Sequence, residues 1–582
     1  MTRTAADDLV DVLVQAGVRR IYGLVGDSLN AFSDAIRRSG GAAAGGIDWV
    51  HVHNEEAAAF AASAEAQLTG RLAVCAGSCG PGNTHLVQGV MDAHRSGAPV
   101  LVLASHIASR QIGSGYFQET DPKALFTQTA HYCEAVQRPD QLVRVSRLAI
   151  QNAVGRRGAA VLVLPGDVLA GHSAGTPVLG DLVRGRPVPV PAPEELRVLA
   201  GHIAAAEKVA IFAGIGCAGA REEVLALAEH LQAPIGHTLR GKDVLQHGNP
   251  FDVGMTGLLG YGACYRALHE ADLVLMLGTD FPYDDFLPGA RTIQIDIDPA
   301  RLGRRTPLVQ GVAADVGATL RALLPLLDRR TDSRFLHDLL HRHERALAHS
   351  IETYTRDHGQ RSPIHPEYLA RILDETAADD AVFTVDTGMC CTWAARYLTP
   401  TGRRRILGSF VHGSMANALP MAIGAQIAAP GRQVVSLSGD GGLAMLLGEL
   451  LTVKTHRLPV KVVVFDNSSL GMVRLEMMVA GDPPFETDHD PVDYAALAAA
   501  AGFHARRVTD PADLRAAVAD LLAHDGPALL DVVTTPDALE VPSHVTLEEA
   551  RGFALSLGKT VLGGGIGQVY ELARRNLRNI PR

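Results

Sequence analysis

The sequence lacks the cysteine pattern of a protein that is stabilised by disulfides or by a metal cluster. It holds 7 cysteines in 582 residues, an odd number, and no pair of CxxC motifs with the spacing of a zinc site. Because intracellular proteins keep their thiols reduced, this cysteine usage favours a protein of the cytosol.

Long apolar runs and an excess of basic residues are also absent. No stretch reaches the ~18–20 uninterrupted apolar residues that a membrane-spanning helix needs. Residues 1–10 are polar and acidic, unlike a signal peptide. The net charge of −10 argues against a general nucleic-acid-binding protein, which would carry a basic face. We therefore expect a cytoplasmic protein that neither crosses a membrane nor binds nucleic acid.

What is present is the composition of a large α/β protein. Hydrophobic residues make up 47% and charged residues 20%, and the chain is too long for a single core. Short apolar runs such as 100–104, 209–213 and 434–437 alternate with helical patterns, which favours parallel sheets covered on both faces. A proline-rich stretch at 184–193 is the clearest linker. The sequence predicts three successive open, mostly parallel-sheet α/β domains and a tail.

A specific motif follows the run 434–437. Gly439-Asp440-Gly441-Gly442 precedes a helix, and Asn467 stands 27 residues after Asp440, at the end of the next strand. A glycine turn lets backbone N–H groups approach a diphosphate, and the helix N-terminus favours its charge. Carboxylate and amide oxygens suit Mg²⁺, which fills its remaining positions with phosphate oxygens and water. A lone Gly-Asp-Gly is more often only a turn, but with Asn467 at this spacing a magnesium-diphosphate site is favoured.

This pair matches the GDG…N motif of the thiamine-diphosphate enzymes. The resemblance extends over nearly the whole chain, through segments 25–30, 54–60, 75–83, 113–120, 254–257, 278–283 and 408–417. Together these segments are similar to the bacterial pyruvate oxidases that use quinone, also called pyruvate dehydrogenase (quinone). The resemblance implies the thiamine-diphosphate-binding fold: a pyrimidine-binding domain at 1–187, an FAD-binding domain at 188–341, a diphosphate-binding domain at 342–537 and a membrane-binding or autoinhibitory segment at 538–582.

The resemblance also implies roles around thiamine diphosphate. Glu55 would hydrogen-bond the aminopyrimidine ring and so activate the cofactor, whereas Glu56 is interpreted as a solvated helix start. Met415 would support the bent cofactor, and Gly413 would accept a hydrogen bond from its amino group. The implied cofactor-binding residues are Gly413, Ser414, Met415, Gly439, Asp440, Gly441, Gly442, Asn467, Ser468, Ser469, Leu470 and Gly471, with Asp440, Asn467 and Ser469 as Mg²⁺ ligands.

Phe117 and Gln118 match the substrate pocket of the family. An apolar wall with one polar group suits a small 2-oxo acid, whose carboxylate must be desolvated before it leaves. His85 falls near the position that the family gives to the thiazolium ring, with a structural role as an equal alternative. Met472 occupies the position of an aromatic residue thought to assist electron transfer to the flavin. The resemblance thus implies Glu55, Phe117, Gln118, His85 and Met472 as catalytic residues.

Some positions depart from the family pattern. Asn54 replaces a common histidine before Glu55, and Asp466 replaces the asparagine usual before Asn467. The wall opposite Phe117 holds Thr387, Cys390 and Cys391 in place of smaller or apolar residues. These departures leave open which 2-oxo acid is preferred and how fast electrons reach the flavin.

The middle of the chain carries Gly214-Ile-Gly216 after the apolar run 209–213, a fragment of a dinucleotide-binding fingerprint. The resemblance adds FAD-binding positions, with Asp296 for a ribose hydroxyl: Met255, Thr256, Gly257, Leu258, Gly278, Thr279, Asp280, Phe281, Pro282 and Asp296. In some thiamine enzymes this domain binds ADP, binds no nucleotide or holds a flavin that takes no part in electron transfer. We expect a redox-active FAD.

The last residues differ in charge from the rest of the chain. Between 551 and 582 stand six basic residues and one acidic residue, a net charge of +5. After the glycines at 563–565, apolar residues recur at helical spacing opposite Arg574, Arg575 and Arg578. A basic amphipathic helix of this kind predicts binding in the plane of an anionic membrane surface, and docking on the protein's own body is the alternative. The resemblance implies that the tail covers the active site at rest.

The expected reaction is the oxidative decarboxylation of pyruvate to acetate and CO₂, with electrons passed through FAD to a membrane quinone. Alternatives are an oxygen- and phosphate-dependent pyruvate oxidase that makes acetyl phosphate, an acetolactate-synthase-like carboligase, and a non-catalytic regulatory module. The resemblance implies a homotetramer with each thiamine site between two subunits, and peripheral association with the cytoplasmic face of the cell membrane.

Overall fold

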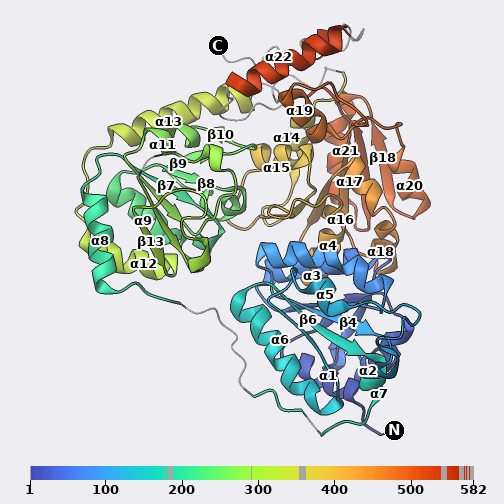
Figure 1. Ribbon diagram of the computed structural model, residues 1–582. Coiled ribbons are helices and arrows are strands. Elements are labelled where there is room, and N and C mark those ends of the chain that lie inside the picture. Colours follow the sequence, from blue (N-terminus) through green and yellow to red (C-terminus); the bar gives the residue numbers. More distant parts are fainter. Residues whose placement is uncertain are drawn as a thin grey trace.

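The computed structural model describes residues 2–175, 177–180, 188–289, 291–352, 355, 362–538 and 547–562, and the single positions 569, 570, 572 and 576. The chain forms three open α/β domains in succession, each built on a parallel or mostly parallel sheet with helices on both faces (Figure 1). The fold class expected from the sequence is confirmed.

The N-terminal domain is a six-stranded parallel sheet in the order β2-β1-β3-β4-β6-β5. Its inner strands β4 and β6 are buried along their whole length, because both faces of the sheet are covered. The elements are α1 (Ala5–Gln15), β1 (Arg20–Gly23), α2 (Asn30–Ser39), β2 (Asp48–His51), α3 (Glu55–Thr69), β3 (Ala73–Gly77), α4 (Pro81–Ser96), β4 (Val100–His106), α5 (Pro122–Phe126), β5 (Tyr132–Ala135), α6 (Leu142–Arg156), β6 (Ala159–Pro165) and α7 (Gly166–Ala170).

The central domain has a seven-stranded sheet in the order β10-β9-β8-β7-β11-β12-β13, in which only the β9–β10 pair is antiparallel among the described strands. The elements are α8 (Pro193–Ala204), β7 (Val209–Ala213), α9 (Arg221–Leu231), β8 (Ile235–His237), α10 (Lys242–Leu245), β9 (Asp252–Met255), β10 (Tyr261–Gly262), α11 (Cys264–Glu270), β11 (Leu273–Leu277), β12 (Arg291–Asp296), β13 (Gln310–Ala313), α12 (Val316–Leu323) and α13 (Arg334–Ala346).

The third domain has a six-stranded parallel sheet in the order β15-β14-β16-β17-β19-β18. Counted from the first strand of each, this is the strand order of the N-terminal sheet. The elements are α14 (Pro366–Thr376), β14 (Val382–Val385), α15 (Met389–Tyr397), β15 (Arg405–Gly408), α16 (Ala418–Ala428), β16 (Val434–Gly439), α17 (Asp440–Met445), α18 (Glu449–Thr455), β17 (Lys461–Asp466), α19 (Gly471–Ala480), α20 (Tyr494–Ala500), β18 (His504–Val508), α21 (Pro511–Ala523) and β19 (Ala528–Val533).

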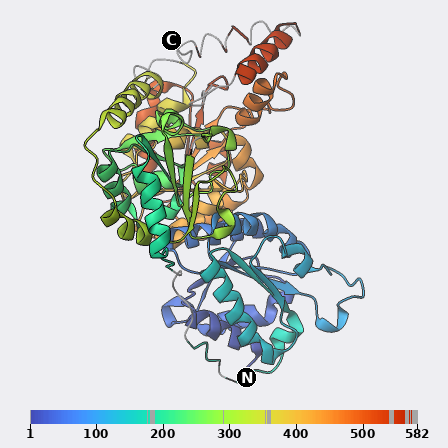
Figure 2. The same ribbon diagram turned by 60° about the vertical axis from the view of Figure 1, so that its left-hand side comes forward.

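The three domains contact one another. Helix α3 packs on α16 so closely that a Cβ at Gly424 would overlap the backbone of Ala61. The Arg405 Nε donates to Asp243 Oδ2 at 2.7 Å and so joins the third domain to the central one. Figures 1 and 2 show the N-terminal domain at one end of the molecule, in blue to cyan, and α22 (Leu547–Leu562) at the other.

Helix α22 packs on α19, where the Ser556 hydroxyl donates to the carbonyl of Asp482 at 2.8 Å. The basic amphipathic helix predicted at 566–582 lies outside the described residues, except for four single positions. Two of these contact the third domain: Leu572 is buried, and the Asn576 side chain donates to the carbonyl of Asp537 at 2.6 Å. Over the described residues, no helix combines the length and the apolar character that crossing a bilayer requires.

Candidate active site

A pocket opens where three neighbouring strands of the third domain end. Asp386 follows β14, Asp440 follows β16 and Asn467 follows β17. The strand order changes direction between β14 and β16, and open parallel sheets bind ligands at such points. The pocket is lined by glycine turns, by methionine and other apolar side chains, and by a few polar groups. The lining includes Thr387, Met389, Cys390, Trp393, Met415, Gly439, Asp440, Gly441, Gly442, Asn467, Ser469, Leu470, Gly471, Met472, Val473, Arg474 and Leu572.

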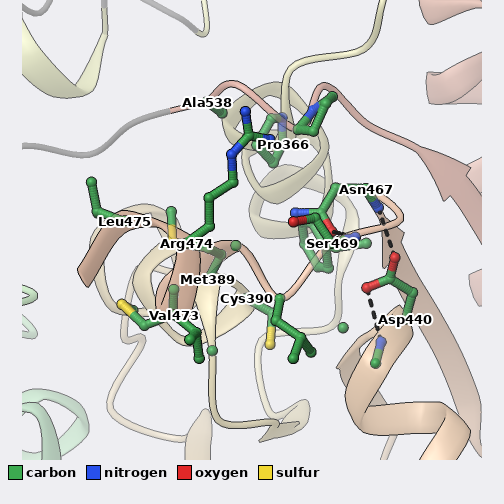
Figure 3. A pocket seen from close by; sticks show the side chains of 18 of the residues that line it. Pro366, Met389, Cys390, Asp440, Asn467, Ser469, Val473, Arg474, Leu475 and Ala538 are labelled. Atoms are coloured by element: carbon green, nitrogen blue, oxygen red, sulfur yellow. Dashed lines mark hydrogen bonds between the residues drawn. The ribbon is translucent and has the colours of Figure 1, made fainter. Parts of the chain in front are cut away.

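Asp440 is the only Asp or Glu among the described residues that line this pocket, and 3% of its side chain is exposed. Its Oδ1 accepts from the Gly441 N–H at 2.9 Å, and its Oδ2 accepts from the Asn467 N–H at 3.1 Å (Figure 3). The ring of His489 also lies 3.2 Å from Oδ2. Burial raises the pKa of Asp440 to about 6. A buried carboxyl group of this kind is suited to a nearby cation, which would offset its desolvation.

The donor set fits a magnesium ion bound together with a diphosphate. Among the described residues, no three His, Cys, Asp or Glu side chains converge on a metal position. A metal here would therefore take oxygens from Asp440, from the Asn467 side chain and from the Ser469 backbone, and its other ligands from phosphate and water. The loop that carries these oxygens is held in place, because the Asn467 Oδ1 accepts from the Ser469 N–H at 3.0 Å and the Ser469 hydroxyl bonds Asp488 at 2.7 Å.

Two glycines of the Gly-Asp-Gly-Gly turn, Gly441 and Gly442, have little space for a side chain, whereas a Cβ at Gly439 would meet no atom within 4 Å. A Cβ at Gly441 would lie 2.7 Å from Leu470 Cδ2 and 3.6 Å from Met415 Cε. A Cβ at Gly442 would overlap Asp386 Oδ2. The turn therefore exposes backbone rather than side chains to the pocket, beside the N-terminus of α17, which is the arrangement that a diphosphate requires.

Asp386 is a functional candidate that the sequence did not reveal. Its Oδ1 accepts from the Asn417 N–H at 3.2 Å and from the Asn417 side-chain amide at 3.1 Å. The same amide donates to the carbonyl of Ser414 at 2.8 Å. Burial raises the pKa of Asp386 to about 7. Asp386 thus connects the turn that carries Met415 to the Gly-Asp-Gly-Gly turn.

Asp466, which departs from the family pattern, has a local countercharge. Its Oδ2 pairs with the Arg507 Nη2 at 3.0 Å, and the other terminal nitrogen of Arg507 pairs with Asp531 Oδ2 at 2.6 Å. The side chains of Asp466 and Asp531 are 2% and 0% exposed. The extra carboxylate is therefore paired by Arg507, behind the metal-binding loop.

Glu55 and His85 come together in the N-terminal domain. Glu55 begins α3, and Asn54 caps this helix by accepting from the Glu56 N–H at 2.9 Å, which explains the asparagine at this position. The buried Glu55 carboxyl lies 3.0 Å from His85 Nδ1. Neither residue lines the pocket of the third domain. Two residues after Glu55, however, Ala57 packs against Ala416, the neighbour of Met415.

The predicted substrate residues separate into two groups. Met472, Thr387 and Cys390 line the pocket of the third domain. Phe117 and Gln118 do not: Phe117 is 78% exposed on the N-terminal domain, and the Gln118 side chain accepts from Cys79 Sγ at 3.5 Å. Within a single chain, the predicted pocket is therefore only partly assembled.

The predicted FAD-binding residues lie at or after the carboxyl ends of β9, β11 and β12, and the Gly214-Ile-Gly216 turn follows β7. The Gly216 N–H donates to the carbonyl of Gly278 at 2.9 Å, and Gly257 lies against the ring of Phe281. The Asp296 Oδ1 accepts from the Asp298 N–H at 2.9 Å. Of the predicted side chains, Asp280 is engaged elsewhere, because it pairs with Arg304 at 2.9 Å. The other predicted FAD-binding residues lie at or beyond the carboxyl ends of the strands, where dinucleotides bind in folds of this type.

Three family models cover most of the chain. They describe a thiamine pyrophosphate enzyme's N-terminal TPP-binding domain, its central domain and its C-terminal TPP-binding domain, and they match residues 3–125, 196–323 and 386–532. The last range contains Asp440, Asn467 and the pocket around them.

Curated relatives match over almost their full length. A Bacillus subtilis (strain 168) protein named "Putative thiamine pyrophosphate-containing protein YdaP" is 35% identical over 95% of this chain and 95% of its own. "Pyruvate oxidase" of Lactiplantibacillus plantarum is 30% identical over 94% of this chain and 91% of its own. "Acetolactate synthase isozyme 2 large subunit" of Escherichia coli (strain K12) is 31% identical over 90% and 94%. Together with the pocket geometry, these matches show that the chain belongs to the family of thiamine pyrophosphate enzymes.

Proposed function

We propose that this enzyme oxidatively decarboxylates pyruvate to acetate and CO₂ and passes the electrons through FAD to a membrane quinone. The observation that carries the proposal is the pocket itself, in which the oxygens of Asp440, Asn467 and Ser469 adjoin a cluster of apolar side chains. Thiamine diphosphate would supply the electron sink for decarboxylation, and FAD a two-electron acceptor.

The chain's own residues would do three things in this reaction. Asp440, Asn467 and Ser469 would hold Mg²⁺ and through it the diphosphate, while the Gly-Asp-Gly-Gly turn offers backbone N–H groups. Met415 and Gly413 would hold the other end of thiamine diphosphate, and Glu55 would hydrogen-bond its aminopyrimidine ring. Met389, Trp393 and Met472 would keep water away from the substrate carboxylate and so favour its loss.

We further propose that a second copy of the chain completes the site. Val25, Ile112, Tyr116 and Phe117 are exposed apolar residues of the N-terminal domain, and Phe117 is 78% exposed. Ile112, Tyr116 and Phe117 lie within one loop, and apolar side chains exposed together in this way favour burial against a partner. A homotetramer, in which the N-terminal domain of one subunit faces the third domain of another, would bring Phe117 and Gln118 to the pocket.

For the electron acceptor we propose a quinone in the cytoplasmic leaflet of the membrane, reached when the C-terminal segment binds anionic lipid. The exposed Leu555 and Leu562 of α22 support an apolar membrane-facing surface. Deletion of residues 559–582 tests this part of the proposal: binding to vesicles of anionic lipid should fall and activity should change. If the deletion changes neither vesicle binding nor activity, the proposed role of the C-terminal segment is wrong.

A carboligase of the acetolactate synthase type is the second candidate, because a synthase subunit matches with an identity similar to that of the oxidase. Two assays with pyruvate separate the candidates, one anaerobic with ferricyanide and one with oxygen and phosphate. Reduction of ferricyanide with formation of acetate supports the proposed function. Acetolactate without reduction would assign the carboligase, and acetyl phosphate in the presence of oxygen and phosphate would assign the other type of pyruvate oxidase.

A further inference from the structure

Arg474 places a cationic group in the otherwise apolar part of the pocket. Arg474 is the only lysine or arginine among the described residues that line this pocket. Most side chains of the lining are apolar, among them Met389, Met472, Val473, Leu475, Met478 and Leu572. The Arg474 side chain is 18% exposed. Guanidinium groups are charged in proteins, and one that is largely buried has lost much of its hydration. An anion that binds there would replace the lost water with a favourable charge interaction.

The hydrogen-bonding capacity of this guanidinium is largely unused. Its contact with Asp537 is an ion pair at 3.5 Å, longer than a charge-assisted hydrogen bond, and among the described residues no hydrogen bond of the guanidinium is recorded. A guanidinium group carries five N–H donors in a planar fork that matches a carboxylate or phosphate. Arg474 can therefore bind an anionic oxygen group while it keeps its pairing with Asp537.

Arg474 points away from the predicted metal ligands. Figure 3 shows its side chain rising from α19 toward Pro366 and Ala538, while Asp440, Asn467 and Ser469 lie on the other side of the pocket. The guanidinium is thus separate from the diphosphate end, where the glycine turn and the metal provide for negative charge. An anion near Arg474 would be a second one, next to the apolar space that the proposed function gives to the substrate.

We propose that Arg474 is a specificity-determining residue that binds a carboxylate or phosphate oxyanion in this pocket. The inference rests on the proposed function and narrows it: the oxyanion comes either from the 2-oxo acid substrate or from inorganic phosphate. Asp537 limits the strength of the site, because it offsets part of the Arg474 charge.

Two substitutions with opposite expected effects test the inference on the holoenzyme. Arg474→Gln removes the charge, and it should raise the KM for pyruvate or the Kd for inorganic phosphate by roughly ten- to a hundredfold. Arg474→Lys should restore part of the affinity. Asp537→Asn removes the competing carboxylate, and it should tighten the same ligand. If Arg474 and Asp537 have only a structural role, Arg474→Gln and Asp537→Asn should lower the thermal midpoint equally. The affinities for pyruvate and for inorganic phosphate should then stay unchanged.

The matched control is Arg371→Gln, which removes an exposed arginine that donates to Glu375 in the same domain. It should leave the KM and the phosphate affinity unaltered. Pyruvate kinetics with ferricyanide report the substrate carboxylate, and calorimetric titration with inorganic phosphate reports the free anion. A loss in the pyruvate arm alone assigns the carboxylate, and a loss in the phosphate arm alone assigns phosphate.

Failure of the proposed function is distinguishable from failure of the inference. If the wild-type enzyme does not turn over pyruvate, the proposed function fails, and phosphate calorimetry still decides the role of Arg474. Binding heat that Arg474→Gln abolishes would then support the anion site. If phosphate gives no heat in that case, or if neither affinity responds to Arg474→Gln, the inference is overturned.

Discussion

The Oδ2 atom of Asp386 occupies the space that a side chain at Gly442 would need. The same carboxyl group accepts two hydrogen bonds from Asn417, two residues after Met415. One buried residue thus fixes the distance between the turn predicted to bind the diphosphate and the turn predicted to support the other end of the cofactor.

The first prediction concerns Gly442. Gly442→Ala should lower the free energy of unfolding by about 1–3 kcal/mol, the usual effect of overpacking, and should weaken thiamine diphosphate binding. The double variant Gly442→Ala with Asp386→Ala should recover part of the binding, because the obstructing oxygen is gone. Isothermal titration calorimetry with Mg²⁺ present measures the affinity. Gly431→Ala is the control, since a Cβ there meets no atom within 4 Å. Wild-type affinity in Gly442→Ala would refute the close contact.

The second prediction concerns the pH dependence of stability. Burial raises the pKa of Asp386 from 3.8 to about 7. In the folded state the group therefore holds a proton that the unfolded state has released, and its contribution to stability is present below about pH 4 and lost as the pH rises through about 7. Asp386→Asn removes this titration and retains an acceptor oxygen for Asn417.

Urea unfolding of both proteins without cofactor, between pH 4 and pH 7, measures the effect. The free energy of unfolding of Asp386→Asn minus that of the wild type should increase with pH over this range. Burial raises the pKa of Asp531 and Glu449 as well, but their effect is common to both proteins and cancels in the difference. A difference independent of pH would contradict a protonated Asp386.

The third prediction concerns Arg507. Arg507→Met leaves Asp466 and Asp531 without their shared countercharge. It should cost about 3 kcal/mol of stability, the lower end of the range for breaking a buried ion pair, because the Arg507 side chain is 25% exposed. Adding Asp466→Asn should restore part of the loss. Denaturant unfolding checks both variants, with Arg506→Met, a more exposed neighbour, as the control. Equal stability of Arg507→Met and the wild type would show that the two carboxyl groups do not need Arg507.

The fourth prediction concerns Glu55. Glu55→Gln keeps the size of the side chain and a hydrogen-bond partner for His85 but removes the carboxyl group. Turnover should fall roughly 10²–10⁴-fold, the range expected when a catalytic acid–base group is lost, while thiamine diphosphate affinity changes little. Glu56→Gln should retain turnover. Steady-state kinetics and calorimetry on the same preparations separate the two effects. Full activity in Glu55→Gln would remove the assigned role.

The sequence predicted most of the inner strands, but it missed the edges of the sheets and the short inner strands β8 and β9. Runs such as 100–104, 209–213 and 434–437 are continuous and apolar because both sides of each strand are covered. The six outermost strands, β2, β5, β10, β13, β15 and β18, were not predicted. Strand β5 is only partly buried along its length, and β18 alternates exposed and partly buried residues over most of its length, so neither has an apolar run to detect.

The candidate site divides in the same way. The Gly-Asp-Gly-Gly turn and Asn467 were predictable because a local motif and the strand ends place them. Asp386 and Arg507 were not, because their roles depend on partners 31 and 41 residues away that only the folded chain brings close. Arg474 carries no motif at all, and only the pocket lining reveals its surroundings.

The measurement that tests the proposed function most directly is the visible spectrum of the purified protein after anaerobic addition of pyruvate, with thiamine diphosphate and Mg²⁺ present. The proposed function predicts a flavin absorption band that bleaches on addition of pyruvate and returns when a quinone analogue is added. A bound flavin that stays oxidised, or a protein without flavin absorbance, would contradict it.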